Sequence, residues 1–129
     1  MSFAHLTLPT RDVARTASFF ESTFGWRRNP VPRNVPVETV WFDIGRGQEI
    51  HVFYVDGFDT SRFEAEFGRH IAIFHPLAGF EALKERLVAR GVTMIPEERT
   101  APYERFFFRE PVNGYVFEVI DEARTPRTA

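Results

Sequence analysis

Three histidines and one glutamate interrupt short apolar segments of this 129-residue chain, and they are its best candidates for chemistry. They stand in Ala-His-Leu (His5), Ile-His-Val (His51), Arg-His-Ile (His70) and Phe-Glu-Val (Glu118). A buried carboxylate is costly, so Glu118 needs a proton, an arginine or a metal ion as its partner. Histidine and carboxylate together bind divalent Fe, Mn, Ni, Co or Zn, and such a site leaves coordination positions open for a substrate.

Each of these histidines alone is more typical of an ordinary core or edge position, so the joint pattern carries the metal hypothesis. Glu49 lies two residues before His51 and shares its strand face, so either side chain can fill the second position. We favour His51, because alignment of the two halves of the chain sets it opposite Glu118. His75 has the opposite parity to His70 in the same segment and is expected to point away from the site.

The first half of the chain predicts a strand, a helix and then further strands. The polar segment Thr10-Arg11-Asp12 is typical of a helix start, and Gly25 ends the apolar pattern that follows. That pattern is Val13, Ala17, Phe20 and Phe24. The expected strands are residues 4–9, 40–44 and 49–55, with a loop or edge segment at residues 26–36.

The second half repeats this order, which predicts an α+β fold of two tandem βαβββ modules. Strands are expected at residues 69–74, 92–96, 105–109 and 115–121, and a helix with the apolar face Phe80, Leu83 and Leu87 ends at Gly91. His5 aligns with His70, Gly25 with Gly91 and Gly47 with Gly114, at separations of 65, 66 and 67 residues. We expect one domain at residues 1–123, with modules at about 1–57 and 67–123 and a flexible tail at 124–129.

Composition excludes several classes of function. Sixteen basic and 18 acidic side chains give a net charge of −2, which argues against a nucleic-acid partner. The absence of cysteine excludes disulfides, thiolate ligands and a cysteine nucleophile. No segment has the character of a secretory signal or a membrane span, so we expect a cytoplasmic protein with a small-molecule partner.

Four segments resemble the vicinal oxygen chelate superfamily, over about residues 3–121. They are Ala-His-Leu-Thr-Leu and Phe-Phe-Glu-Ser-Thr-Phe-Gly-Trp in the first module, then Gly-Arg-His-Ile-Ala-Ile and Glu-Pro-Val-Asn-Gly-Tyr-Val-Phe-Glu-Val in the second. This superfamily includes glyoxalase I, methylmalonyl-CoA epimerase, extradiol dioxygenases, fosfomycin-resistance enzymes and bleomycin-binding proteins. Members usually carry Asp-Pro-Asp-Gly before the last strand, whereas Glu110 and Val112 replace both acids here.

The resemblance implies a curved, cup-like mixed sheet with its helices outside. It also implies one divalent ion held at the positions of His5, His51, His70 and Glu118. In the glyoxalase and epimerase branches all four positions bind metal, whereas the dioxygenase branch uses His5, His70 and Glu118 with Fe(II). Bleomycin-binding members lack the ligand set. Members commonly dimerise, so the resemblance implies a homodimer.

Our first hypothesis is a metal-dependent lyase or isomerase of the glyoxalase or epimerase type, in which the ion stabilises an enolate and Glu118 or Glu49 takes the proton. The alternatives are an Fe(II) extradiol-type dioxygenase, which consumes O2, and a metal-free protein that binds a small molecule or an antibiotic. Tyr54 and Tyr103 are candidate hydrogen-bond donors to the substrate. Candidate contacts for an anionic substrate are the loop arginines Arg27, Arg28 and Arg33.

Overall fold

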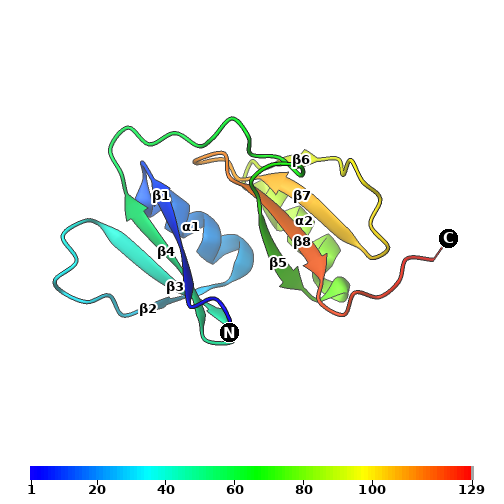
Figure 1. Ribbon diagram of the computed structural model, residues 1–129, viewed down its shortest axis with the longest axis horizontal. Coiled ribbons are helices and arrows are strands. Elements are labelled where there is room, and N and C mark those ends of the chain that lie inside the picture. The colour runs from blue at the N-terminus through cyan, green and yellow to red at the C-terminus, as the bar shows by residue number, and fades with distance from the viewer. Residues whose placement is uncertain (129) are drawn as a thin grey trace. The chain divides into compact units, whose positions relative to one another are not determined.

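The computed structural model describes residues 1–128, and its helices and strands follow the predicted order (Figure 1). The chain divides into two compact units, Met1–Asp59 and a second that begins at Thr60. Each unit has a four-stranded sheet and an α-helix of its own. Residue 129, the last residue of the expected tail, lies outside the described residues.

The first unit contains β1 (His5–Thr10), α1 (Val13–Phe24), β2 (Arg27–Asn29), β3 (Thr39–Gly45) and β4 (Gln48–Tyr54). Its sheet has the order β1-β4-β3-β2. β1 runs parallel to β4, and the other pairs are antiparallel. A parallel pair needs a crossover connection, which α1 begins directly after β1.

The second unit repeats this topology with β5 (Ile71–His75), η1 (Leu77–Gly79), α2 (Phe80–Ala89), β6 (Thr93–Ile95), β7 (Arg105–Arg109) and β8 (Val116–Asp121). Its sheet has the order β5-β8-β7-β6, and again only the first pair is parallel. The prediction of an α+β fold built from two βαβββ modules with mixed sheets is therefore confirmed. The expected strand at residues 69–74 begins two residues later, so His70 directly precedes β5.

The helices begin and end where the sequence predicts. The Asp12 side chain accepts a hydrogen bond from the Arg15 N–H at 2.9 Å, which satisfies one free donor in the first turn of α1. Gly25 ends α1 with a φ of 69°, and Gly91 follows α2 with a φ of 85°. Both glycines adopt the left-handed conformation that other residues resist, which explains why each helix stops there.

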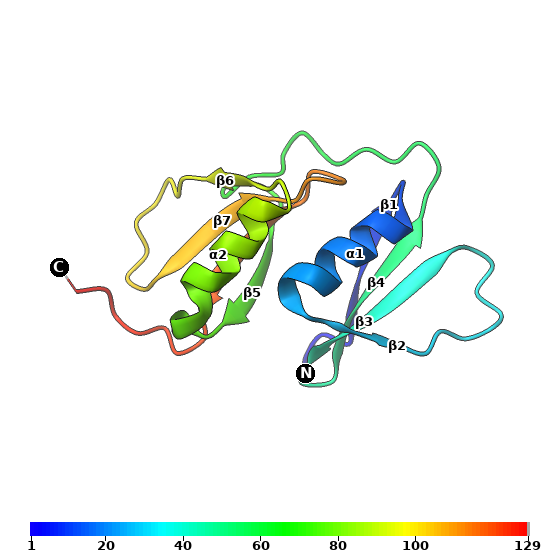
Figure 2. The ribbon, with the colours of Figure 1, turned by 180° about the vertical axis from the view of Figure 1, so that it is seen from behind.

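Each helix lies across one face of its own sheet and leaves the opposite face for other side chains (Figure 2). Ile50 and Val52 in β4 are at most 1% exposed on the face that α1 covers. In the second unit, Phe80 of α2 packs edge-on against Phe106 of β7. Because side chains alternate along a strand, His51 in β4 and Phe107 in β7 each point to the face of their own sheet that the helix does not cover. We call these the open faces of the two sheets.

The turn before β8 keeps its structure although both usual acids are replaced. The Glu110 carboxylate accepts hydrogen bonds from the N–H groups of Val112, Asn113 and Tyr115 at 2.6, 2.8 and 3.3 Å. Its longer side chain therefore satisfies the turn by itself. Burial raises the pKa of Glu110, although the three N–H groups oppose this effect.

The residues after β8 make specific contacts. Pro126 forms an isolated bridge with Tyr103, and the Arg127 guanidinium donates to Glu97 at 2.8 Å and to the Ala101 carbonyl at 2.9 Å. No helix among residues 1–128 is long and apolar enough to cross a membrane.

Candidate functional site

The strand register gives His51 and Glu118 equivalent positions in the two modules. Thr7 of β1 pairs with His51, and Ala72 of β5 pairs with Glu118. His5 and His70 each lie two residues before those partners in the chain, on the same faces. On the other side, His51 pairs with Trp41 of β3 and Glu118 with Phe107 of β7. Each open face therefore carries one candidate pair: His5 with His51, and His70 with Glu118.

In the first unit, three rings form a stack on the open face. The rings of His5 and His51 are 3.9 Å apart and inclined by 11°, and the indole of Trp41 lies 3.8 Å from His51 at 4°. This stack leaves His51 only 4% exposed. Packing on both sides limits rotation of the His51 ring and presents its nitrogens along the edge of the stack.

Glu49 joins this pair from the same face of β4. Its Oε1 lies 3.1 Å from His51 Nε2, and its Oε2 accepts a hydrogen bond from Asn29 Nδ2 at 2.6 Å. The hydrogen bonds from Asn29 and then His51 lower the pKa of Glu49, so it is ionised at neutral pH. His51 takes the position in the first module that Glu118 takes in the second, and Glu49 supplies a carboxylate beside His51.

In the second unit, His70 and Glu118 meet directly. His70 Nε2 lies 3.2 Å from Glu118 Oε1, and His70 Nδ1 lies 3.2 Å from the Ala65 carbonyl oxygen. Both partners are acceptors, so a neutral His70 ring donates its one proton either from Nδ1 to the carbonyl or from Nε2 to the carboxylate. With the proton on Nδ1, the lone pair of Nε2 would be available to a metal ion beside Glu118. A carbonyl that orients the other ring nitrogen is also the usual support of a metal-binding histidine.

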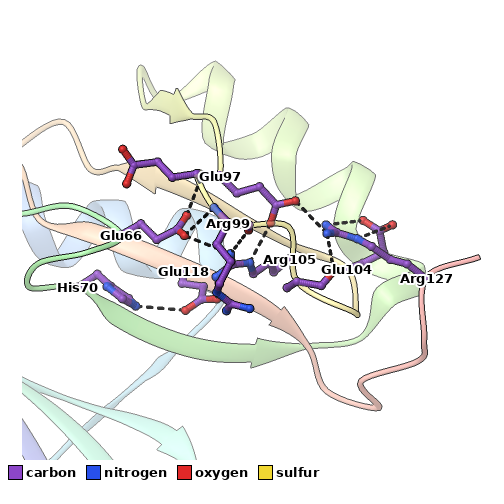
Figure 3. A network of polar contacts seen from close by, with 10 residues as sticks. Glu66, His70, Glu97, Arg99, Glu104, Arg105, Glu118 and Arg127 are labelled. Carbon is purple, nitrogen blue, oxygen red and sulfur yellow. Dashed lines mark hydrogen bonds and ion pairs between the residues drawn. The ribbon is translucent and has the colours of Figure 1, made fainter. Parts of the chain in front are cut away.

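Arg105 in β7 holds the other oxygen of Glu118, and sequence reasoning did not identify it. Its Nη1 donates to Glu118 Oε2 at 2.9 Å, and its Nε donates to Glu97 at 2.8 Å (Figure 3). Its Nη2 donates to Glu66 at 3.3 Å and to the Arg99 carbonyl. Burial lowers the pKa of Arg105, but the hydrogen bonds that it donates to Glu118 and Glu97 raise it overall. The sequence did contain an indication of Arg105, because a charged residue adjoins apolar Phe106 in a predicted strand. His5 was identified as a candidate by the same kind of pattern.

This network holds more negative than positive charge. Glu66, Glu97, Glu104 and Glu118 supply four carboxylates, against the two guanidinium groups of Arg105 and Arg127. Burial alone would raise the pKa of Glu66, but the N–H groups of Glu98 and Arg99 and the guanidinium of Arg105 lower it. Arg105 alone therefore faces three carboxylates, Glu66, Glu97 and Glu118.

The open face of each sheet carries imidazole nitrogens and carboxylate oxygens with supporting hydrogen bonds, and these groups are ligands that a divalent first-row metal accepts. Residues 1–128 contain no group of three or more histidine, aspartate or glutamate side chains placed to hold a metal ion.

The other residues named from the sequence occupy different places. His75 lies against Phe80 on the helix side of its sheet, where burial and then Arg86 lower its pKa. Tyr54 alternates with His51, so it lies on the opposite face, and its hydroxyl donates to Asp56 at 3.2 Å. Arg28 pairs with Glu21 at 2.8 Å.

A cavity of about 310 Å³ lies within the second unit beside the Arg105 network. Its lining comes from residues 64–66, from residues 95–98 and from Arg109. Glu66 and Glu97, which both bind Arg105, belong to that lining, whereas His70 and Glu118 do not.

Two duplicated modules with histidine and carboxylate at matched positions on their open faces define a class of two-module α+β proteins. Residues 2–119 match the model of the Glyoxalase/Bleomycin resistance protein/Dioxygenase superfamily, so the chain belongs to this superfamily. No curated protein sequence matches it.

Several solved structures share the fold. A fosfomycin resistance protein, FosX from Listeria monocytogenes, in complex with Mn(II) and 1S,2S-dihydroxypropylphosphonic acid, is 21% identical with a TM-score of 0.77, over 93% of this chain and 91% of that one. FosX from Mesorhizobium loti is 21% identical with a TM-score of 0.72, over 92% and 90%. A protein assigned to the glyoxalase family in Bacillus anthracis is 20% identical with a TM-score of 0.75, over 94% of each chain.

Proposed function

We propose that this chain is a metal-dependent enzyme that chelates neighbouring oxygens of a small substrate. His5, His51, His70 and Glu118 bind one divalent ion, and the reaction is of the lyase or isomerase type. The observation that carries the proposal is the shared register, in which His51 and Glu118 take equivalent positions and His5 and His70 take the matching ones. Chance placement of lone histidines does not account for this correspondence.

The ion, once bound, supplies positive charge that stabilises negative charge developing on a substrate oxygen. The four residues would hold the ion, and coordination positions left open would take the substrate oxygens. His51 is held in a fixed ring orientation by its stack with His5 and Trp41. His70 is oriented by the Ala65 carbonyl, so both histidines are arranged before any substrate arrives.

Glu49 is the better candidate for the residue that takes a proton from the substrate. Both carboxylates have a partner on each oxygen: His70 and Arg105 for Glu118, and His51 and Asn29 for Glu49. The Glu49 side chain is 27% exposed against 8% for Glu118, so a substrate reaches Glu49 more readily. In this proposal Glu118 acts as a ligand and Glu49 as the general base.

A second candidate reaction is the modification of a small phosphonate. The FosX structure with Mn(II) carries a ligand whose two hydroxyl groups stand on neighbouring carbons, which is the oxygen arrangement that our proposal requires. This candidate uses the same ion and the same four residues. The two candidates differ in substrate and in reaction, so a substrate screen separates them.

The test is turnover by the metal-loaded chain against hemithioacetals, acyl-CoA thioesters, fosfomycin and catechols, with oxygen uptake recorded in parallel. We expect turnover of an oxygenated substrate without oxygen uptake, its loss after chelation of the metal, and its loss in His70→Ala. Oxygen uptake with a catechol would replace this proposal with the Fe(II) dioxygenase. Ligand binding by protein that takes up no metal would replace it with a metal-free binding protein. A homodimer is part of the proposal, and light scattering measures the mass directly.

A further inference from the structure

The two carboxylate oxygens of Glu118 have different partners. Oε2 accepts a hydrogen bond from Arg105 at 2.9 Å, whereas Oε1 lies 3.2 Å from the ring nitrogen of His70. The Arg105 side chain is 3% exposed and the Glu118 side chain 8%, so solvent does little to screen their interaction. The carboxylate cannot turn without losing one of these two contacts.

The guanidinium of Arg105 is itself fixed from several directions. Glu97 binds Nε, Glu66 binds Nη2, and the Arg99 carbonyl also accepts from Nη2. The ring of Phe107 lies 4.9 Å below the guanidinium carbon. A planar group with this many partners on different sides has one available orientation.

We infer that Arg105 is a positioning residue, which reserves one oxygen of Glu118 for itself and leaves the other beside His70 as a single-oxygen ligand. This inference rests on the proposed function for the identity of the bound ion. Its geometric part stands on the Arg105 network alone.

Segment 64–66 extends the same support to His70. The Ala65 carbonyl faces His70 Nδ1, and Glu66 binds both Arg105 and the N–H groups of Glu98 and Arg99. One short segment therefore fixes the ring of His70 directly and the carboxylate of Glu118 through Arg105. Both candidate ligands of the second unit depend on it.

Arg105→Lys is the discriminating substitution, because lysine keeps the positive charge. Any change therefore reports on orientation rather than on the net charge near the ion. The lysine ammonium is a point donor and cannot bind Glu66, Glu97 and Glu118 in the directions that the guanidinium does. The matched control is Arg127→Lys, since Arg127 binds Glu97 in the same network and has no contact with Glu118.

The first readout is the Kd for Mn(II), measured by electron paramagnetic resonance of the free ion. We expect Arg105→Lys to raise this Kd by about 10- to 100-fold, as changes beside metal ligands do, and Arg127→Lys to change it by less than about twofold. Equal binding by Arg105→Lys and the wild type, or an equal loss in both variants, would overturn the inference.

The second readout needs no metal. In a crystal structure of metal-free Arg105→Lys we expect Glu118 Oε1 to move beyond about 3.5 Å from His70 Nε2, out of hydrogen-bond range. Glu118 in its original orientation would overturn the inference even if Mn(II) binding were weaker. Failure of the wild type to bind Mn(II) would defeat the proposed function, and this structure would still decide the role of Arg105.

A second variant covers a failure of Arg105→Lys to fold. Glu66→Gln leaves the Arg105 bond to Glu118 in place and removes one charged support of the guanidinium. We expect about a tenfold rise in the Kd for Mn(II), and an unchanged Kd would count against the inference.

Discussion

Replacement of His70 by alanine should abolish the stabilisation that a divalent metal gives the protein. A ligand at 100 times its Kd stabilises the folded state by about 2.7 kcal/mol. At an unfolding entropy of about 2.1 cal/mol/K per residue, this gain raises the melting temperature of a chain of this length by about 10 °C. The wild type with saturating Mn(II) or Ni(II) should show a shift of this size.

In His70→Ala the shift should nearly vanish. Loss of one ligand weakens binding by at least about 100-fold, so the same metal concentration then equals the Kd and adds only about 0.4 kcal/mol. That gain corresponds to about 1 to 2 °C. The variant also loses the ring contacts with the Ala65 carbonyl and Glu118, which should lower the stability of the metal-free protein by about 1 to 2 kcal/mol.

His75→Ala is the matched control, because His75 lies in the same segment but on the helix side of the sheet. Its loss should lower the melting temperature without metal and leave the metal-induced shift at about 10 °C. The assay is thermal unfolding followed by circular dichroism, with and without metal. A shift that survives in His70→Ala, or that disappears equally in His75→Ala, would refute the assignment of His70 as a ligand.

Three further outcomes follow from the structure. In a Trp26→Phe background, Trp41 is the sole tryptophan, and its ring stacks on that of His51. We therefore expect a paramagnetic ion bound at His51 to quench the fluorescence of Trp41. Unchanged emission at saturating Mn(II) would contradict the placement of His51 at the site. Glu49→Gln should lower kcat by about 100-fold while metal content stays at the wild-type level, and loss of metal instead would make Glu49 a ligand rather than the base. Burial would raise the pKa of Asp121, but the N–H groups of Thr125 and Ala123 lower it below its unfolded value, so its stabilising effect is present above about pH 4 and is lost as the pH falls through the folded pKa. The stability difference between the wild type and Asp121→Asn in urea unfolding should therefore shrink between pH 7 and pH 3, and a constant difference would show that the charge of Asp121 is not its cause.

The fold was largely predictable because local signals and the repeat agreed. α1 begins after Asp12 and ends at Gly25, as the capping preferences of these two residues predict. The apolar residues Phe80, Leu83 and Leu87 form the buried face of α2, also as predicted. Strand parity also separated His75 from His70 correctly, since a two-residue period needs no tertiary information. Boundaries were less certain, as the late start of β5 after His70 shows.

The surroundings of the candidate ligands were not predictable in the same way. Glu118 was expected to need a proton, an arginine or a metal ion, but nothing local indicates that Arg105, 13 residues earlier, would hold it. That contact depends on the antiparallel pairing of β7 with β8. The contact between the Ala65 carbonyl and His70 Nδ1 depends on the path of an irregular segment, which sequence periodicity does not predict.

The most direct measurement is the number of metal ions per chain in protein purified without a metal-affinity tag. Elemental analysis by mass spectrometry should find about one first-row divalent ion per wild-type chain and almost none in His5→Ala or Glu118→Gln. A wild-type preparation without Fe, Mn, Co, Ni or Zn, even after dialysis against each ion, would contradict the account. So would a full complement of metal in both variants.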